Sequence, residues 1–184
     1  MILRPMGRKY QEKKMSGDIN KAVNNIVHVD DLEWREVSHG DKFHLFGKSF
    51  TVPSGARELG CGFFRLPPGK RSFPEHYHMA NEEAIYILKG EGTHICGGKE
   101  HIVREGNFIS LPRGEDYSHQ MYNHSDEDLE YLCMSTMKEP EVVLYPKSGK
   151  MGVLAGSAPG GDPANVAIRK FFYPQEAGYF DGED

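Results

Sequence analysis

Two histidines and a carboxylate lie close together in the stretch HYHMANEE, residues 76–83. Residues i and i+2 of a β-strand point to the same face about 7 Å apart, so His76 and His78 can share one ion. Glu83 follows His78 by five residues, the wrong parity for one continuous strand, so a short loop over 79–81 must intervene. Neutral imidazoles with a carboxylate suit Mn, Fe, Co, Ni or Zn better than Ca or Mg. The stretch is a candidate transition-metal site with open coordination positions.

A fourth candidate ligand lies further along the chain. The segment HQMYN begins with His119, and inward alternation would continue through Met121 to Asn123. Glu82 points outward if Glu83 points inward, which suits a solvated position or one beside a ligating imidazole. A His-x-His pair also occurs by chance, so the pair alone does not establish a metal site. His94 and His101 flank a hairpin and lack a carboxylate at ligand spacing, so we interpret them as exposed or hairpin residues, and His124 points away from His119 by odd parity. No local pattern marks the remaining histidines as ligands: His28, His39 and His44.

Short alternating segments separated by glycine and proline run from about residue 25 onward. Such segments at this spacing, without a convincing helical period, predict an all-β antiparallel sandwich or barrel. The predicted strands are EWREV (33–37), LGCGFFRL (59–66), AIYILKG (84–90), GTHIC (92–96), HIVRE (101–105), NFISLP (107–112), SHQMYN (118–123), LEYLCMST (129–136) and EVVLYP (141–146).

The length of 184 residues predicts one domain with additional segments at both ends. We expect an N-terminal arm over 1–24, a barrel over 25–147 and a C-terminal arm over 148–184. GDINKAVNNI near residue 20 can form a short helix with Asp18 as its N-cap. The C-terminal arm starts glycine-rich and continues with aromatic residues, so we expect it to pack on the barrel or on a partner subunit.

Composition excludes several classes of protein. The net charge is −5, and a nucleic-acid surface would need clustered Lys and Arg. No secretory signal or apolar run of membrane-spanning length is present, which predicts a cytoplasmic protein that does not interact with membranes. Three cysteines without a Cys-x-x-Cys pair argue against a disulfide framework. Residues 1–14 are basic and are expected to form a mobile tail, and Met15 is an alternative start.

The stretch GKRSFPEHYHMANEEAIYILKG, residues 69–90, resembles the first motif of the cupin family. That motif runs Gly, five residues, His-x-His, three or four residues, Glu, six residues, Gly. Six residues separate Gly69 from His76 instead of five. The positions that fit the motif are His76, His78, Glu83 and Gly90.

The stretch GNFISLPRGEDYSHQMYN, residues 106–123, resembles the second cupin motif. That motif runs Gly, five residues, Pro-x-Gly, two residues, His, three residues, Asn. Here four residues separate the second glycine from the histidine. The matching residues are Gly106, Pro112, Gly114, His119 and Asn123.

The resemblance implies a double-stranded β-helix, which is a jelly-roll-like antiparallel barrel, in a small single-domain cupin. It also implies one divalent transition-metal ion, Mn, Fe, Ni or Zn, inside the barrel. Small barrels of this family usually pair, so we expect a homodimer. The implied metal ligands are His76, His78, Glu83 and His119.

Neither the fold nor the metal ion determines which reaction, if any, the protein catalyses. A metal with open positions supports isomerase chemistry on a hydroxy-carbonyl compound, and Fe or Mn would support a dioxygenase. The substrate would be a small sugar, sugar phosphate or organic acid. The alternative is a non-catalytic metallo-cupin that binds such a molecule. Candidate ligand contacts are the loop cations Lys70, Arg71 and Arg113 and the wall residues Phe73, Tyr77 and Met121, although core packing and solvent exposure explain them equally well.

Overall fold

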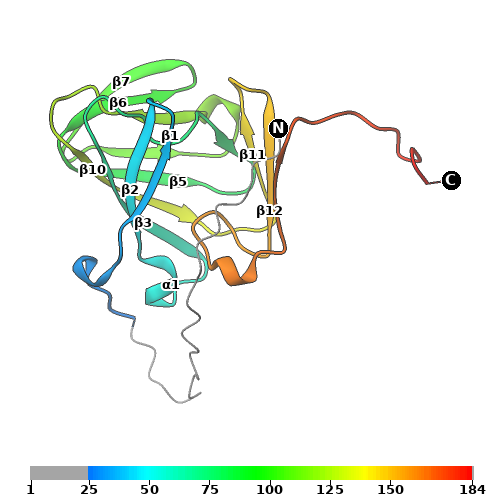
Figure 1. Cartoon of the computed structure of the whole chain (residues 1–184), viewed down its shortest axis with the longest axis horizontal. Helices are drawn as coiled ribbons and strands as arrows, with labels where there is room; N and C mark the ends of the chain where they lie inside the picture. The colour runs from blue at the N-terminus through cyan, green and yellow to red at the C-terminus, as the bar shows by residue number, and fades with distance from the viewer. Residues whose placement is uncertain (1–24, 184) are drawn as a thin grey trace, which may run out of the picture.

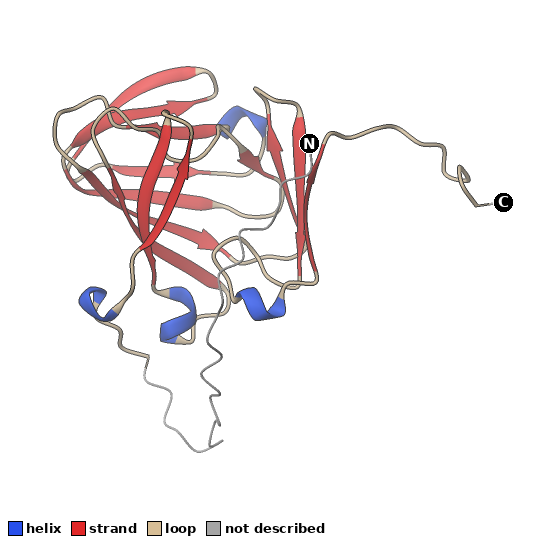
Figure 2. Ribbon diagram, viewed as in Figure 1, coloured by secondary structure: helices blue, strands red, loops and turns tan. Residues whose placement is uncertain are grey.

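The computed structural model describes residues 25–183. The arm expected over 1–24, with the proposed N-cap Asp18, lies outside the described residues. Within residues 25–183 the chain is mostly β, and its strands form antiparallel sheets of six, four and three strands (Figure 2). This confirms the prediction of an all-β antiparallel barrel. None of the helices in the described range has both the length and the apolarity that a membrane crossing requires.

The six-stranded sheet combines segments that are far apart in the sequence (Figure 1). The long strand β10 lies at its centre and pairs with β3 on one side and β5 on the other. The strands are, in spatial order, β1 (Arg35–His39), β2 (Phe43–Ser49), β3 (Leu59–Leu66), β10 (Leu129–Thr136), β5 (Glu83–Lys89) and β8 (Phe108–Leu111).

The two smaller sheets complete the barrel. One has the order β13 (Ile168–Phe172), β12 (Lys150–Ala155), β11 (Glu141–Tyr145) and β4 (Tyr77–His78). The other has the order β7 (Lys99–Arg104), β6 (Glu91–Cys96) and β9 (His119–Tyr122). Isolated bridges, such as that between His76 and His119, join the segment before β4 to β9. The described helical elements are short: α1 (Thr51–Ser54), η1 (Val29–Asp31), η2 (Glu115–Tyr117) and η3 (Pro163–Asn165).

The strands with regular alternation were predicted well, and LGCGFFRL and LEYLCMST match β3 and β10 residue for residue. Strand β2 was missed because Gly47 interrupts its apolar face. A Cβ atom at that glycine would lie 2.8 Å from the ring of Phe64, so the gap in the pattern is a packing requirement. The strands β12 and β13 were also missed. In β12, Gly152 packs in the same way against Phe171.

Part of the segment 148–184 continues the four-stranded sheet. Strand β12 pairs with β11, and β13 pairs with β12 (Figure 1). Beyond β13 the chain runs away from the barrel, and the side chains of Tyr179 and Phe180 are exposed. Some aromatic residues of this segment, Phe171 and Phe172, therefore belong to the strand β13. Others, Tyr179 and Phe180, lie on the extended chain that follows it.

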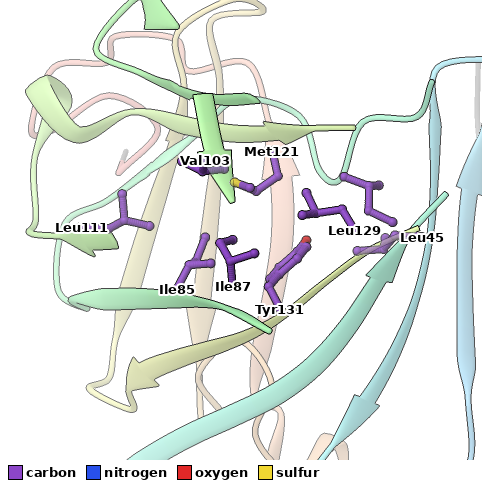
Figure 3. Packing of buried hydrophobic residues seen from close by; sticks show 9 residues of the cluster. Leu45, Ile85, Ile87, Val103, Leu111, Met121, Leu129 and Tyr131 are labelled. Carbon is purple, nitrogen blue, oxygen red and sulfur yellow. The ribbon is translucent and has the colours of Figure 1, made fainter. Parts of the chain in front are cut away.

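The hydrophobic core fills the barrel between the six-stranded sheet and the three-stranded sheet (Figure 3). On β5, Ile85 and Ile87 point inward and are buried, whereas Tyr86 and Leu88 are exposed. This alternation is the one expected of a strand with one face against a core. The buried core residues are Leu45, Leu66, Ile85, Ile87, Val103, Leu111, Met121, Leu129 and Tyr131.

Replacing Ile87 with alanine should lower the free energy of unfolding by about 2–5 kcal/mol, because the side chain is fully buried and its removal leaves a cavity. Leu88→Ala, on the same strand but 38% exposed, is the matched control and should cost less than about 1 kcal/mol. Urea unfolding followed by circular dichroism measures both. Equal losses would contradict the inward face assigned to β5.

Candidate metal centre

The four residues predicted as metal ligands lie together inside the barrel. Each offers one ligand atom, and these atoms all lie within 4.8 Å of one another. The Oε2 atom of Glu83 is 3.1 Å from Nε2 of His119 and 3.5 Å from Nε2 of His78. The ring of His76 has its centroid 4.7 Å from that of His119. The structure therefore brings all four side chains to one point.

Backbone pairing between the two motif segments positions two of these side chains. The N–H of His76 donates to the carbonyl of His119 at 3.2 Å, and the N–H of His119 donates to the carbonyl of His76 at 2.8 Å. Residues directly opposite each other in such a pair carry their side chains on the same face of the sheet. His76 and His119 are therefore adjacent although 42 residues separate them in the chain.

The loop predicted over residues 79–81 separates β4 from β5 and is closed by a carboxylate from β11. Glu141 is 0% exposed, and its Oε1 accepts hydrogen bonds from the backbone N–H groups of Met79 and Ala80, each at 3.1 Å. Its Oε2 accepts from the backbone N–H of Asn81 at 3.0 Å and from the side-chain amide of the same residue. The loop between the His78 and Glu83 positions is thus fixed by one buried anion.

Glu141 also contacts His78, with Oε2 3.4 Å from Nδ1 of the ring. Sequence reasoning missed this residue because it lies 63 positions after His78 and begins an ordinary apolar strand. Glu82, which was considered for a place beside an imidazole, is exposed. Its outward direction agrees with the predicted parity, but the carboxylate beside the ring belongs to Glu141.

The three imidazoles direct the same ring nitrogen toward the protein. Nδ1 of His76 lies 2.8 Å from the carbonyl of Pro74, and Nδ1 of His119 lies 2.9 Å from the carbonyl of Tyr117. A carbonyl can only accept, so Nδ1 is the protonated nitrogen in both rings, as it also is in His78 beside Glu141. Each ring therefore leaves Nε2 for the centre of the cluster, which is the orientation that metal-ligating histidines need.

The electrostatics of the cluster favour deprotonated His76 and ionised Glu83. Burial, followed by the neighbouring rings of His119 and His78, lowers the pKa of His76 to about 3. Burial alone would raise the pKa of the Glu83 carboxyl, but its bonds with His119 and His78 hold it well below its usual range. For His78, burial disfavours the charged ring, yet Glu141 and Glu83 together raise its pKa to about 9.

The contacts of His78 within the protein are poor hydrogen bonds. Neither ring nitrogen has a partner with good hydrogen-bond geometry, because both carboxylate oxygens lie at 3.4–3.5 Å. A buried nitrogen without a good partner is costly. Three imidazole nitrogens and one carboxylate oxygen form a donor set that fits a divalent transition-metal ion. The residues present therefore fit the group that the motifs imply.

A cavity of about 560 Å³ opens onto this cluster. Of the six residues proposed to contact a ligand, Phe73 and Met121 line the cavity. Tyr77 does not, because it lies between the two inward histidines and has the opposite parity. The apolar wall of the cavity comes mainly from Val37, Leu45, Phe64, Ile85, Val143 and Leu154.

The three loop cations do not line the cavity either. Lys70 donates from Nζ to the carbonyl of Asp41 at 2.8 Å. Arg71 donates to Oε1 of Gln120 at 2.8 Å, and its guanidinium lies 4.5 Å from the ring centroid of Tyr122. Arg113 is exposed. Proximity in sequence to the motifs did not predict which cations reach the cavity.

Among the remaining histidines, His94 differs from the expectation of exposure. It is buried on β6, with its ring centroid 6.5 Å from that of His119. Burial, and then the charges of His119 and His101, lower its pKa to about 4. It lies outside the four-residue cluster.

Comparison with known proteins identifies the family. Residues 62–135 match the family described as Cupin domain, and this stretch contains all four clustered residues. The chain contains a cupin domain. Its barrel is accordingly the double-stranded β-helix that the two motifs implied, with the histidines and the glutamate at the positions of the cupin motifs.

Two solved structures share this fold over most of the chain. A candidate sugar phosphate isomerase from Acidithiobacillus ferrooxidans is 22% identical with a TM-score of 0.68, covering 82% of this chain and 92% of that one. A sugar phosphate isomerase of the cupin superfamily from Silicibacter pomeroyi is 21% identical with a TM-score of 0.66, covering 80% and 92%. At these identities the likeness establishes the fold.

A characterised relative matches a shorter part of the chain. The oxalate-binding protein of Thermotoga maritima is 37% identical over 70 residues, which is 38% of this chain and 55% of the relative. The chain therefore spans about half of the length of that protein. By its name, that relative binds a small dicarboxylate.

Replacing Glu141 with glutamine should lower the free energy of unfolding by about 1–3 kcal/mol, because an amide cannot accept all the hydrogen bonds that end on the carboxylate. The same change should lower the pKa of His78 from about 9, since a neighbouring negative charge is lost. An NMR titration of His78 in chelator-treated protein measures this. Glu82→Gln is the exposed control, and an unchanged pKa in Glu141→Gln would contradict the orienting role.

Proposed function

We propose that this cupin binds one divalent transition-metal ion, Mn, Fe, Ni or Zn, through His76, His78, Glu83 and His119. The observation that supports the proposal is the common orientation of the three rings. Backbone carbonyls accept from Nδ1 of His76 and His119, and Nδ1 of His78 faces Glu141 at 3.4 Å. Each Nε2 is therefore left for one point that Glu83 also reaches. Protein packing alone gives no reason for such convergence.

We further propose that the protein acts on a small oxygenated molecule, a sugar, sugar phosphate or organic acid, as an isomerase or dioxygenase. A metal bound here supplies Lewis-acid polarisation of a substrate oxygen and, if Fe or Mn, redox chemistry. The protein itself contributes a rigid His78 and a carboxylate that stays ionised. Its apolar wall excludes water from the ligand.

The relatives support different forms of this proposal. The two structures of highest TM-score reported above are named for sugar phosphate isomerisation, which favours an isomerase. The apolar wall, which includes Phe64 and Ile85, also suits a dioxygenase substrate. The oxalate-binding relative favours the second candidate, a metallo-cupin that binds an organic acid without converting it.

His76→Ala and His78→Ala should each reduce the metal content from about one ion per chain to near none while leaving the barrel folded. Elemental analysis of the purified proteins measures the metal, and circular dichroism checks the fold. His101→Ala, an exposed histidine outside the cluster, is the control and should keep its metal. Wild-type protein that is folded and cannot be loaded with any of these metals would refute the proposal.

Metal affinity should fall as the pH falls. Because the pKa of His78 is about 9 in the metal-free protein, the ion must displace a proton from this ring at every pH below that value. The apparent affinity should then drop by about tenfold per pH unit between pH 8 and pH 6. Competition with a chromophoric chelator measures it. An affinity that does not change over this range would contradict displacement of a proton.

Measurements of turnover distinguish the proposed enzyme from the alternative, a non-catalytic binding protein. Protein loaded with each metal should either consume oxygen with diols and keto-acids or interconvert isomers of a phosphorylated sugar, followed by NMR. His78→Ala should lose that activity. If ligands bind to metal-loaded protein without oxygen uptake or isomerisation, the non-catalytic alternative holds.

A further inference from the structure

Among the Lys, Arg, Asp and Glu side chains along the cavity, most are cationic, although the chain carries a net charge of −5. Among the described residues, the lining contains a single carboxylate, Glu83, and that group already contacts two imidazoles. Outside the histidine cluster, the charged lining residues are therefore all basic: Arg35, Lys48, Lys150 and Arg169.

One of the four cations is engaged by the protein. Lys48 is buried, donates from Nζ to the carbonyl of Val29 at 2.9 Å, and lies 4.7 Å from the ring centroid of Trp34. The other three form no ion pair with any acidic side chain in the described part of the chain. Arg35, Lys150 and Arg169 thus direct uncompensated charge to the cavity.

These three cations come from two sheets. Arg35 lies on the edge strand β1 of the six-stranded sheet, and Lys150 and Arg169 lie on β12 and β13 of the four-stranded sheet. Along β13, Arg169 and Phe171 line the cavity, whereas the intervening Lys170 does not. Strand alternation therefore selects the residues that face the cavity.

Tyr145 connects the cations to the histidine cluster. Lys150 Nζ lies 4.4 Å from the centroid of the Tyr145 ring, and the same ring is stacked 5.8 Å from the ring of His76. Arg169 also acts on Tyr145, because its charge opposes the rise in the tyrosine pKa that burial causes. Lys150 is therefore one aromatic ring away from the candidate metal ligand His76.

We propose that Arg35, Lys150 and Arg169 form an anion-binding mouth that holds the phosphate or carboxylate group of the ligand. The oxygen-bearing end of the same ligand then reaches the histidine cluster, and its middle contacts the apolar wall. Arginine and lysine bind both anions through charge-assisted hydrogen bonds. The placement of the ligand's oxygen-bearing end at the histidine cluster rests on the proposed function. The anion site does not require a bound metal.

Three small aromatic probes test the site: phenyl phosphate, benzoate and neutral phenol. NMR titration of isotope-labelled protein, as purified and again after chelator treatment, gives the affinities and locates the shifted residues. Phenyl phosphate or benzoate should bind more tightly than phenol, with shifts at the cavity. If phenyl phosphate has the higher affinity, the natural ligand is a phosphate ester. If benzoate has the higher affinity, it is an organic acid.

Charge-removing variants provide the decisive comparison. Lys150→Gln and Arg169→Gln should each weaken the preferred anion by about tenfold and leave phenol unchanged. Lys170→Gln is the matched control, since it removes an exposed charge from the same strand without touching the cavity, and it should bind like the wild type. Circular dichroism confirms that each variant is folded.

Two results would overturn the proposal: phenol binding as tightly as both anions, or anion affinity that is unchanged in the double variant Lys150→Gln, Arg169→Gln. Failure of the metal proposal gives a different result. Anion binding would then still depend on Arg169 in protein that takes up no metal. The anion-site proposal and the metal proposal can therefore be refuted independently.

Discussion

A buried carboxylate on β11 determines the geometry of the candidate metal centre. Glu141 is fully buried without a lysine or arginine partner among the described ion pairs, a situation that is costly unless other donors satisfy the charge. The His78 ring lies 3.4 Å from this carboxylate. Three consecutive backbone N–H groups and a side-chain amide supply the donors. The loop they belong to sets the separation of His78 and Glu83. The contact thus stabilises the loop and orients a candidate ligand at the same time.

The other two candidate ligands depend on backbone pairing. His76 and His119 lie opposite each other in a bridge that closes the barrel between β4 and β9. Backbone hydrogen bonds fix such positions more tightly than a loop does, because the sheet on either side must move with them. The site therefore requires no folding beyond that of the barrel itself.

Sequence reasoning succeeded where the information is local. Short alternating segments identified β3 and β10 residue for residue, and motif spacing identified the four clustered side chains. It failed where contacts join distant segments. Glu141 reaches His78 only because β11 pairs with β4, and no local pattern encodes that pairing. Likewise Arg71, next to the first motif, turns to Gln120, whereas Arg169, far from both motifs, reaches the cavity.

Strand β11 also relates the two ends of the proposed ligand site. Its residues Glu141, Val143 and Tyr145 share one face by strand alternation, and they span about 13 Å. Glu141 contacts His78, and Val143 lines the cavity. The ring of Tyr145 lies under Lys150. One strand therefore contacts the histidine cluster at Glu141 and, through Tyr145, lies under Lys150 of the proposed anion-binding mouth. Because both contacts depend on the backbone of β11, the candidate metal centre and the proposed anion site are held in a fixed relation to each other.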